Sequence, residues 1–126
     1  MLQIFLVLAA SVLTTVSAQL CLKKGVAGLG DLNFSFSNIF SLIFRILQNG
    51  WLITGLFFFG VSFLVWIFVL SKFQLNVVYP VTVSVNFCLI TIASWFLFKE
   101  YLGFVQILGI ATIIFGTFLV LFKGSL

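Results

Sequence analysis

Five polar side chains inside two apolar stretches have the types and spacing to bind a polar, uncharged group. They are Thr15, Gln19, Tyr79, Thr82 and Asn86. Neighbours within each stretch are three or four residues apart, so a helix presents them on one face. Hydroxyl and amide groups both donate and accept hydrogen bonds. The pattern predicts two polar faces, one on each helix, that look toward the interior of the protein.

Each of these side chains also has a purely structural interpretation. A threonine hydroxyl in an apolar helix commonly donates to the carbonyl four residues earlier, and amides can join neighbouring helices. Gln19 and Asn86 are the stronger candidates, because a primary amide has several bonding positions and is costly to bury unpaired. For these two, lining a cavity and joining helices stay equally open.

The residues needed for catalysis or metal binding are scarce. The chain has no His, two Cys and two acidic residues, Asp31 and Glu100. A zinc site, a pair of catalytic carboxylates or a His-dependent triad would need more. We therefore expect neither an enzyme nor a metal or cofactor site. Cys21 and Cys88 are interpreted as small apolar packing residues.

The elements that position the polar side chains are membrane spans. Of the 126 residues, 63% are hydrophobic and 6% are charged, whereas soluble domains carry roughly 25% charged residues. A helical span takes about 20 apolar residues, so one domain with four spans is expected. The expected spans are residues 2–22, 51–71, 76–98 and 103–122. The predicted fold is an all-α integral membrane bundle of four transmembrane helices, with Pro80 in the first turn of the third.

Two segments have alternative interpretations. Residues 34–48 alternate apolar and polar side chains at helical spacing, which predicts an amphipathic helix in the membrane interface. An N-terminal extension of the next span is equally open. The first span could instead be a cleaved secretory signal, because small residues at 16–18 precede Gln19. The lack of basic residues before it and its length favour a span.

The connections and the cations predict a topology. The last three spans are joined by short connections, so we expect them to be antiparallel neighbours. One side of the membrane would carry Lys23, Lys24, Arg45 and Lys99, and the other Lys72 and Lys123. The positive-inside rule makes the first side cytoplasmic and places both termini outside. Cations at the edges of spans suit anionic lipid headgroups, and no nucleic-acid-binding groove is predicted. Glu100 is expected to form a charge pair with Lys99.

Small residues on the last span predict a close helix contact. Gly109, Thr112 and Gly116 follow one another at steps of three and four, which lets another helix approach. Packing within one subunit would explain this seam, but we favour contact between subunits because four helices alone enclose little.

Several short motifs along the chain resemble a known family. They are Gln19–Lys23 at the end of the first span, Trp66 in the second, Val78–Pro80 opening the third, Asn86 followed by Phe87, Glu100 after that span, and Gly109 with Gly116 in the fourth. In this order they resemble the small multidrug resistance branch of the drug/metabolite transporter superfamily. Within that branch the chain is most similar to subunits of the 4-amino-4-deoxy-L-arabinose-phosphoundecaprenol flippase.

One departure from the multidrug pattern decides between branches. Cation-exporting members carry a buried glutamate on the first helix, whereas this chain has Thr15 at about that position and no acid before Asp31. The aromatic residue that helps those exporters hold flat cations is Thr82 here. A lipophilic cation would find no counter-charge and a proton no carrier, so cation efflux is the weaker alternative.

The resemblance implies a substrate built of a sugar, a phosphate and a polyprenyl chain. The sugar would bind Thr15, Gln19, Tyr79, Thr82 and Asn86 while the chain stays in the membrane lipid. The phosphate would bind Lys23 and Arg45, with Lys24 or Lys99 as second choices. The protein would form a homodimer, or a heterodimer with a related four-helix subunit, packed in opposite orientations in the bacterial inner membrane. A further alternative is a non-transporting membrane subunit of a glycosyltransferase complex.

Overall fold

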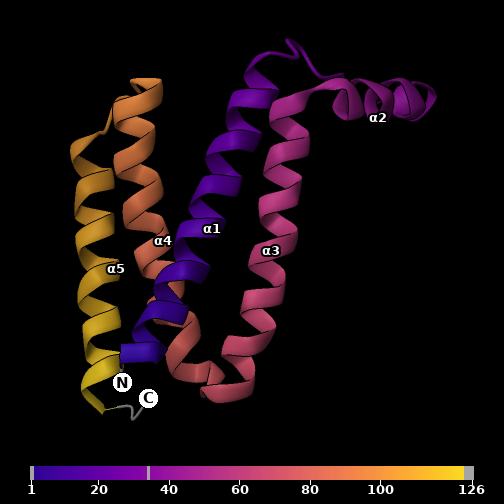
Figure 1. The fold of residues 1–126 in the computed structure, drawn as a ribbon. Helices are drawn as coiled ribbons and strands as arrows, with labels where there is room; N and C mark the ends of the chain where they lie inside the picture. The colour runs from indigo at the N-terminus through magenta and orange to yellow at the C-terminus, as the bar shows by residue number, and fades with distance from the viewer. Residues whose placement is uncertain (1, 34, 124–126) are drawn as a thin grey trace.

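The computed structural model describes residues 2–33 and 35–123 (Figure 1). The described part of the chain is helical, with turns and short connections between the helices. The helices are α1 (Leu2–Ala27), the short 3-10 helix η1 (Phe36–Asn38), α2 (Ile39–Gln48), α3 (Gly50–Lys72), α4 (Leu75–Phe98) and α5 (Phe104–Lys123). Four of them, α1, α3, α4 and α5, are long and apolar enough to cross a membrane. The predicted four-helix membrane bundle is confirmed.

The end of α1 and the position of Pro80 in α4 differ from what was expected. Helix α1 continues to Ala27, past the expected end at residue 22, because long lysine side chains can reach the interface from inside a helix. Helix α4 begins at Leu75, so Pro80 lies beyond its first turn. The interpretation of Pro80 as a first-turn residue is therefore wrong. Its missing N–H leaves the Asn76 carbonyl without its helical partner.

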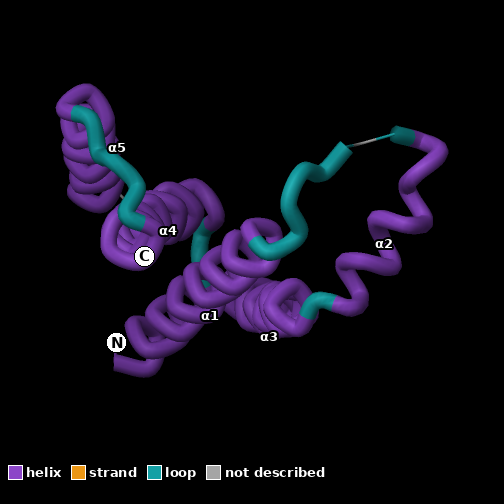
Figure 2. Tube along the Cα trace, turned by 90° about the horizontal axis from the view of Figure 1, so that it is seen from above, coloured by secondary structure: helices purple, strands orange, loops and turns teal. Residues whose placement is uncertain are grey.

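Helix α1 forms the centre of the bundle (Figures 1 and 2). It packs along α3 and also contacts α4, whereas α5 packs on α4. Helices α3 and α4 run in opposite directions, as expected, but α1 lies between them. Within the described residues their contact is concentrated near the connecting turn, where the Trp66 and Tyr79 rings meet edge to face with centroids 6.0 Å apart. The expectation that α3 and α4 pack as direct neighbours is wrong along most of their length.

The α1–α3 contact depends on small residues in a seven-residue repeat. The series is Ser11, Ala18 and Gly25 on α1, and Gly55 and Ser62 on α3, continued there by the larger Val69, all of them buried. A seven-residue repeat keeps one seam of a helix facing its partner, and small residues let helix backbones approach closely. We call these six residues the small-residue interface. It explains why α1 packs mainly on α3.

The spacing at two glycines measures how close the helices are. A Cβ atom added at Gly25 would lie 2.6 Å from the Leu52 side chain, and one at Gly55 would lie 2.9 Å from that of Leu22. Ordinary van der Waals contact needs more room than this. The interface therefore leaves no space for larger residues at these two positions.

Helix α2 is separate from α3, and Asn49 makes the break. The Asn49 side-chain oxygen accepts hydrogen bonds from the backbone N–H groups of Trp51 (3.0 Å) and Leu52 (3.4 Å), which caps α3. Its amide nitrogen donates to the Gly25 carbonyl at 3.0 Å. One side chain thus ties the end of α1 to the start of α3. Helix α2 leaves this junction sideways, away from the other helices (Figure 1).

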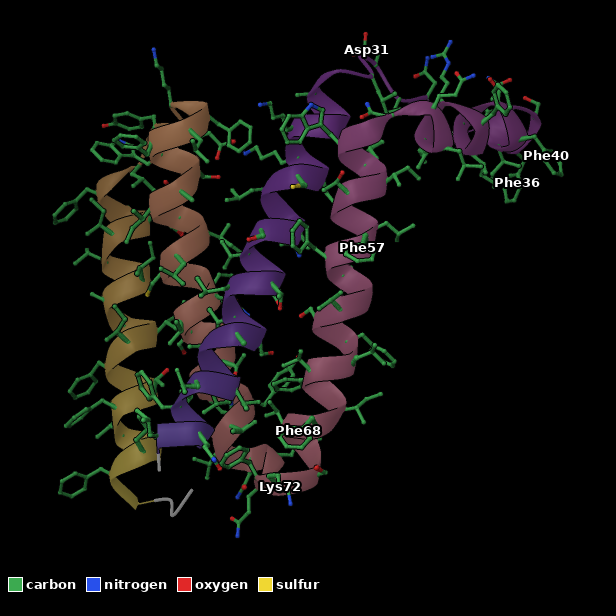
Figure 3. The ribbon with its side chains drawn as sticks, in the orientation of Figure 1. Asp31, Phe36, Phe40, Phe57, Phe68 and Lys72 are labelled. Carbon is green, nitrogen blue, oxygen red and sulfur yellow. The ribbon has the colours of Figure 1, made fainter. Side chains whose placement is uncertain are left out.

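Helix α2 exposes an apolar face. Phe36, which precedes it in η1, and Phe40 are 98% and 84% exposed, and both lie on the side turned toward the depth of the spans (Figure 3). Asp31 lies beyond the helix ends on the side of the bundle where α2 lies, and Lys72 lies at the opposite end of the bundle. A helix with this division between apolar and polar faces suits the membrane interface.

Candidate substrate groove and cation rim

The polar face of α1 is turned largely toward α3. Ser11 is 1% exposed. The Thr15 hydroxyl donates to the Ser11 carbonyl oxygen at 2.8 Å and also contacts the Ser62 hydroxyl on α3. Because the Thr15 proton is already engaged, Ser62 is the donor in this contact. Thr15 therefore helps to join two helices, and its assignment to a substrate stays a prediction.

The polar residues of α4 differ in how fully they are paired. Thr82 is buried, and its hydroxyl donates to the Val78 carbonyl at 2.8 Å. Tyr79 is 54% exposed. The side-chain oxygen of Asn86 is buried and has no hydrogen-bond partner among the described residues. An unpaired buried carbonyl is costly, so Asn86 is the strongest binding candidate of the predicted set.

An apolar groove runs between α1 and α4. Its volume is about 270 Å³, and Val12 and Leu13 face Val85 and Leu89 across it. Thr82 is the only hydroxyl-bearing residue in its lining. Asn86 follows the lining residue Val85 in α4 but is not itself part of the groove lining.

The two predicted amides lie at different depths. Gln19 is exposed and sits one turn before Lys23, near the end of the bundle where Lys23 meets Glu100. Asn86 instead lies at the level of the groove, next to Val85. No hydrogen bond joins them within the described part of the chain. A ligand that contacts both must therefore extend along the bundle axis.

At the end of the bundle nearest α2, Lys23 pairs with Glu100. The Lys23 ammonium donates to the Glu100 carboxylate and lies 4.9 Å from the centroid of the Phe98 ring. The expected Glu100–Lys99 pair is wrong, because Lys99 adopts a left-handed conformation (φ 53°) that ends α4. The hydrogen bond from Lys23, with one from Ser94, holds the pKa of Glu100 below its usual value.

The remaining predicted phosphate ligands have different surroundings. Lys24 lies over the Trp51 ring, 4.0 Å from its centroid, and Lys99 is exposed. Arg45 lines a separate polar hollow beside α2 and forms no ion pair among the described residues. Lys23, Lys24, Arg45 and Lys99 are here called the cation rim. Their grouping at one end of the bundle agrees with the expected topology (Figure 1), and its cytoplasmic orientation stays a prediction.

The predicted seam on α5 is not covered by another helix of the described chain, although Gly109 also lines a hollow that α5 shares with α4. A Cβ atom added at Gly109 or Gly116 would meet nothing within 4 Å. The Thr112 hydroxyl donates to the Leu108 carbonyl of its own helix at 2.9 Å. None of the apolar window of α5 is buried. The seam therefore does not serve packing among the described residues of this chain.

Sequence reasoning missed three contacts that join neighbouring helices of the bundle. Ser62 meets Thr15, and the Ser84 hydroxyl on α4 meets that of Thr117 on α5. Asn49 joins α1 to α3. The seven-residue spacing of small residues on α1 and α3 was a detectable signal for the first of these contacts, whereas no local pattern marks the other two.

Together these features define a class of protein. Four membrane-spanning helices carry hydroxyl and amide groups, and the only two acidic residues of the chain lie outside the spans. Cations gather at one end. This is a small multi-pass membrane protein of the transporter type.

Known proteins place the chain within that class. A probable 4-amino-4-deoxy-L-arabinose-phosphoundecaprenol flippase subunit ArnE from Proteus mirabilis is 33% identical over 89% of this chain and 90% of its own length. The ArnE subunit of Pseudomonas fluorescens Pf-5 is 38% identical over 58% of this chain, a match that spans 63% of that relative. The corresponding ArnF subunit of Serratia proteamaculans is 32% identical over 89% of this chain and 87% of its own length.

The chain belongs to the family of 4-amino-4-deoxy-L-arabinose-phosphoundecaprenol flippase subunits. This confirms the resemblance inferred from the short motifs. The relatives are named as subunits of a flippase and not as enzymes. No protein-family model matches the chain, and no solved structure matches it.

Proposed function

We propose that this chain is a subunit of a flippase that moves 4-amino-4-deoxy-L-arabinose-phosphoundecaprenol across the bacterial inner membrane by alternating access. The observation that carries the proposal is the uncharged polar interior, and above all the buried, unpaired oxygen of Asn86. A sugar hydroxyl can donate to this oxygen. Membership of the family supplies the identity of the lipid.

The groove fits the other parts of such a substrate. The apolar walls between α1 and α4 suit a polyprenyl chain. Such a chain is already in an apolar environment in lipid, so it binds the groove only if it packs closely against these walls. The cation rim supplies positive charge for the phosphate at the interface. Lys23 can bind the phosphate only by exchanging its Glu100 partner for it, whereas Arg45 needs no such exchange.

A partner subunit completes the proposal. The α5 seam of Gly109, Thr112 and Gly116 is open, and the relatives carry the names of two different subunits, ArnE and ArnF. We propose that a second four-helix subunit, identical or related, packs against this seam in the opposite orientation. An inverted pair can expose a central site to each face in turn.

Transport in proteoliposomes tests the proposal. The full chain, alone and with a related subunit, is reconstituted with the amino-sugar lipid, and a membrane-impermeant amine reagent reports the lipid on the outer face. We expect Asn86→Ala and Gln19→Ala to slow translocation, while Asn76→Ala, an exposed amide on the same helix as Asn86, leaves it unchanged. Full transport in both groove variants would remove the proposed site.

The same preparation separates the rival functions. Cation efflux predicts resistance to quaternary ammonium dyes in cells that express the chain, which the absence of an acid in the spans argues against. If the chain is a non-transporting glycosyltransferase subunit, it should co-purify with a large enzyme. It should then translocate no lipid, either alone or with the related subunit. Absence of translocation by wild-type protein in both pairings would contradict the flippase proposal.

A further inference from the structure

A second polar site lies outside the bundle, between the α1–α2 connection and α2. This polar hollow has a volume of about 340 Å³. Its lining consists of Asp31, Leu32, Asn33, Asn38, Ser41, Leu42 and Arg45. The volume falls at the lower end of the range of about 300–1,000 Å³ found for small-ligand sites. Unlike the α1–α4 groove, it is lined mainly by polar side chains, which include one acidic and one basic residue.

The two charged residues of the hollow are available to a ligand. Asp31 and Arg45 line the same hollow, yet neither forms an ion pair among the described residues. Asn33, Asn38 and Ser41 lie around them. An unpaired carboxylate takes an ammonium group, and an unpaired guanidinium binds phosphate through two parallel hydrogen bonds. The hollow therefore offers complementary positions for a zwitterion that also carries hydroxyl groups.

Helix α2 places this hollow at the depth of lipid headgroups. Phe36, Phe40, Phe44 and Leu47 are between 60% and 98% exposed, and Figure 3 shows Phe36 and Phe40 directed toward the depth of the spans. Lipid chains cover such a face in the membrane interface. Arg45 and the connection that carries Asp31 then lie beside the headgroups, where a lipid phosphate is located.

We propose that the polar hollow is an entry site for the headgroup of an amino-sugar phospholipid, in which Asp31 binds the sugar amine and Arg45 the phosphate. The identity of the lipid rests on the proposed function. Phosphatidylethanolamine also carries an amine and a phosphate, but it lacks the sugar hydroxyls that Asn33, Asn38 and Ser41 would bind. The hollow thus selects the lipid before its headgroup reaches the groove between α1 and α4.

Binding of soluble analogues to the full chain in phosphatidylcholine nanodiscs tests the site. The probes are decyl esters of 4-amino-4-deoxyarabinose phosphate and of arabinose phosphate, and short-chain phosphatidylethanolamine. We expect the amino sugar to bind wild-type protein at least about tenfold more tightly than arabinose phosphate, as expected for one charge-assisted hydrogen bond. It should also bind more tightly than phosphatidylethanolamine, which lacks the sugar hydroxyls. Equal affinity for the two sugars, or equal affinity for phosphatidylethanolamine, would overturn the assignment.

Four variants locate the effect. Asp31→Asn is expected to abolish the preference for the amine without changing affinity for arabinose phosphate. Arg45→Gln is expected to lower the affinity for both sugar phosphates by about tenfold. Arg45→Lys should have an affinity between those of the wild type and Arg45→Gln, because lysine cannot bind phosphate in a bidentate manner. Lys72→Gln removes a cation at the other end of the bundle and should change neither affinity. A preference for the amine that survives Asp31→Asn overturns the site.

Failure of this site and failure of the proposed function give different results. Asp31 and Arg45 are exposed, so their variants are expected to elute as the wild type does on size exclusion. Wild-type transport with unchanged binding in Asp31→Asn and Arg45→Gln would overturn the entry site alone. Selective binding by wild-type protein that translocates no lipid would support the site and contradict the flippase proposal.

Discussion

Substitution of Gly55 by alanine tests the small-residue interface between α1 and α3. The new Cβ atom would lie 2.9 Å from two carbons of the Leu22 side chain and 3.1 Å from the Ala18 carbonyl oxygen. The leucine can change its rotamer, but the carbonyl belongs to the α1 backbone and moves only if the helix moves. Overpacking of this kind costs roughly 1–3 kcal/mol.

Gly60→Ala is the matched control on the same helix. A Cβ atom there meets nothing within 4 Å, so this variant keeps the gain in helix propensity, about 1 kcal/mol, without a clash. Gly55→Ala has the same gain in helix propensity, but it also has the destabilising cost of overpacking. We therefore expect Gly55→Ala to be less stable than Gly60→Ala by roughly 1–3 kcal/mol.

Reversible unfolding in mixed detergent micelles measures the difference. The free energy of unfolding of both variants and of the wild type is obtained from tryptophan fluorescence as the denaturing detergent is increased. The close approach of α1 and α3 also predicts that Gly55→Ala slows transport more than Gly60→Ala does, because α1 forms one wall of the groove. Equal stability of the two alanine variants would refute the tight α1–α3 contact.

Three further predictions concern the junctions of the bundle. Asn49→Ala should lower the free energy of unfolding by about 1–2 kcal/mol, because it removes the cap of α3 and the bond to α1, whereas Asn38→Ala should have little effect because its side chain caps nothing. The lowered pKa of Glu100 means that its pairing with Lys23 is complete above the ordinary carboxylate pKa of 4.5 and is lost as the pH falls through the lower folded-state value. Chemical cross-linking between the ends of α1 and α4 should detect this loss. Glu100→Gln should abolish the pH dependence of the cross-linking. Gly116→Leu should leave the monomer folded, because its site is open, and should reduce chemical cross-linking between subunits; unchanged cross-linking would contradict the α5 seam.

The Lys23–Glu100 contact shows how sequence neighbours mislead. Glu100 adjoins Lys99 in the chain, so a local pair was expected. The left-handed conformation of Lys99 ends α4, while α1 brings Lys23 to the same place. The partner of Glu100 is therefore set by how α1 and α4 pack.

The amino-acid sequence by itself determined the number of spans and the kind of interior. Long apolar runs with few charges fold as helices in lipid because backbone groups must be paired within the segment, and this needs no knowledge of tertiary contacts. The same holds for the absence of an acid within the spans, which separates the chain from cation exporters.

Tertiary structure alone decided which polar groups are paired and which are open. Thr15 and Asn86 fit the same helical pattern, yet Thr15 meets Ser62 on α3 while the oxygen of Asn86 is buried unpaired. Helical spacing defines a face but not its neighbour. That neighbour was set by the close packing of α1 on α3, which places α1 between α3 and α4.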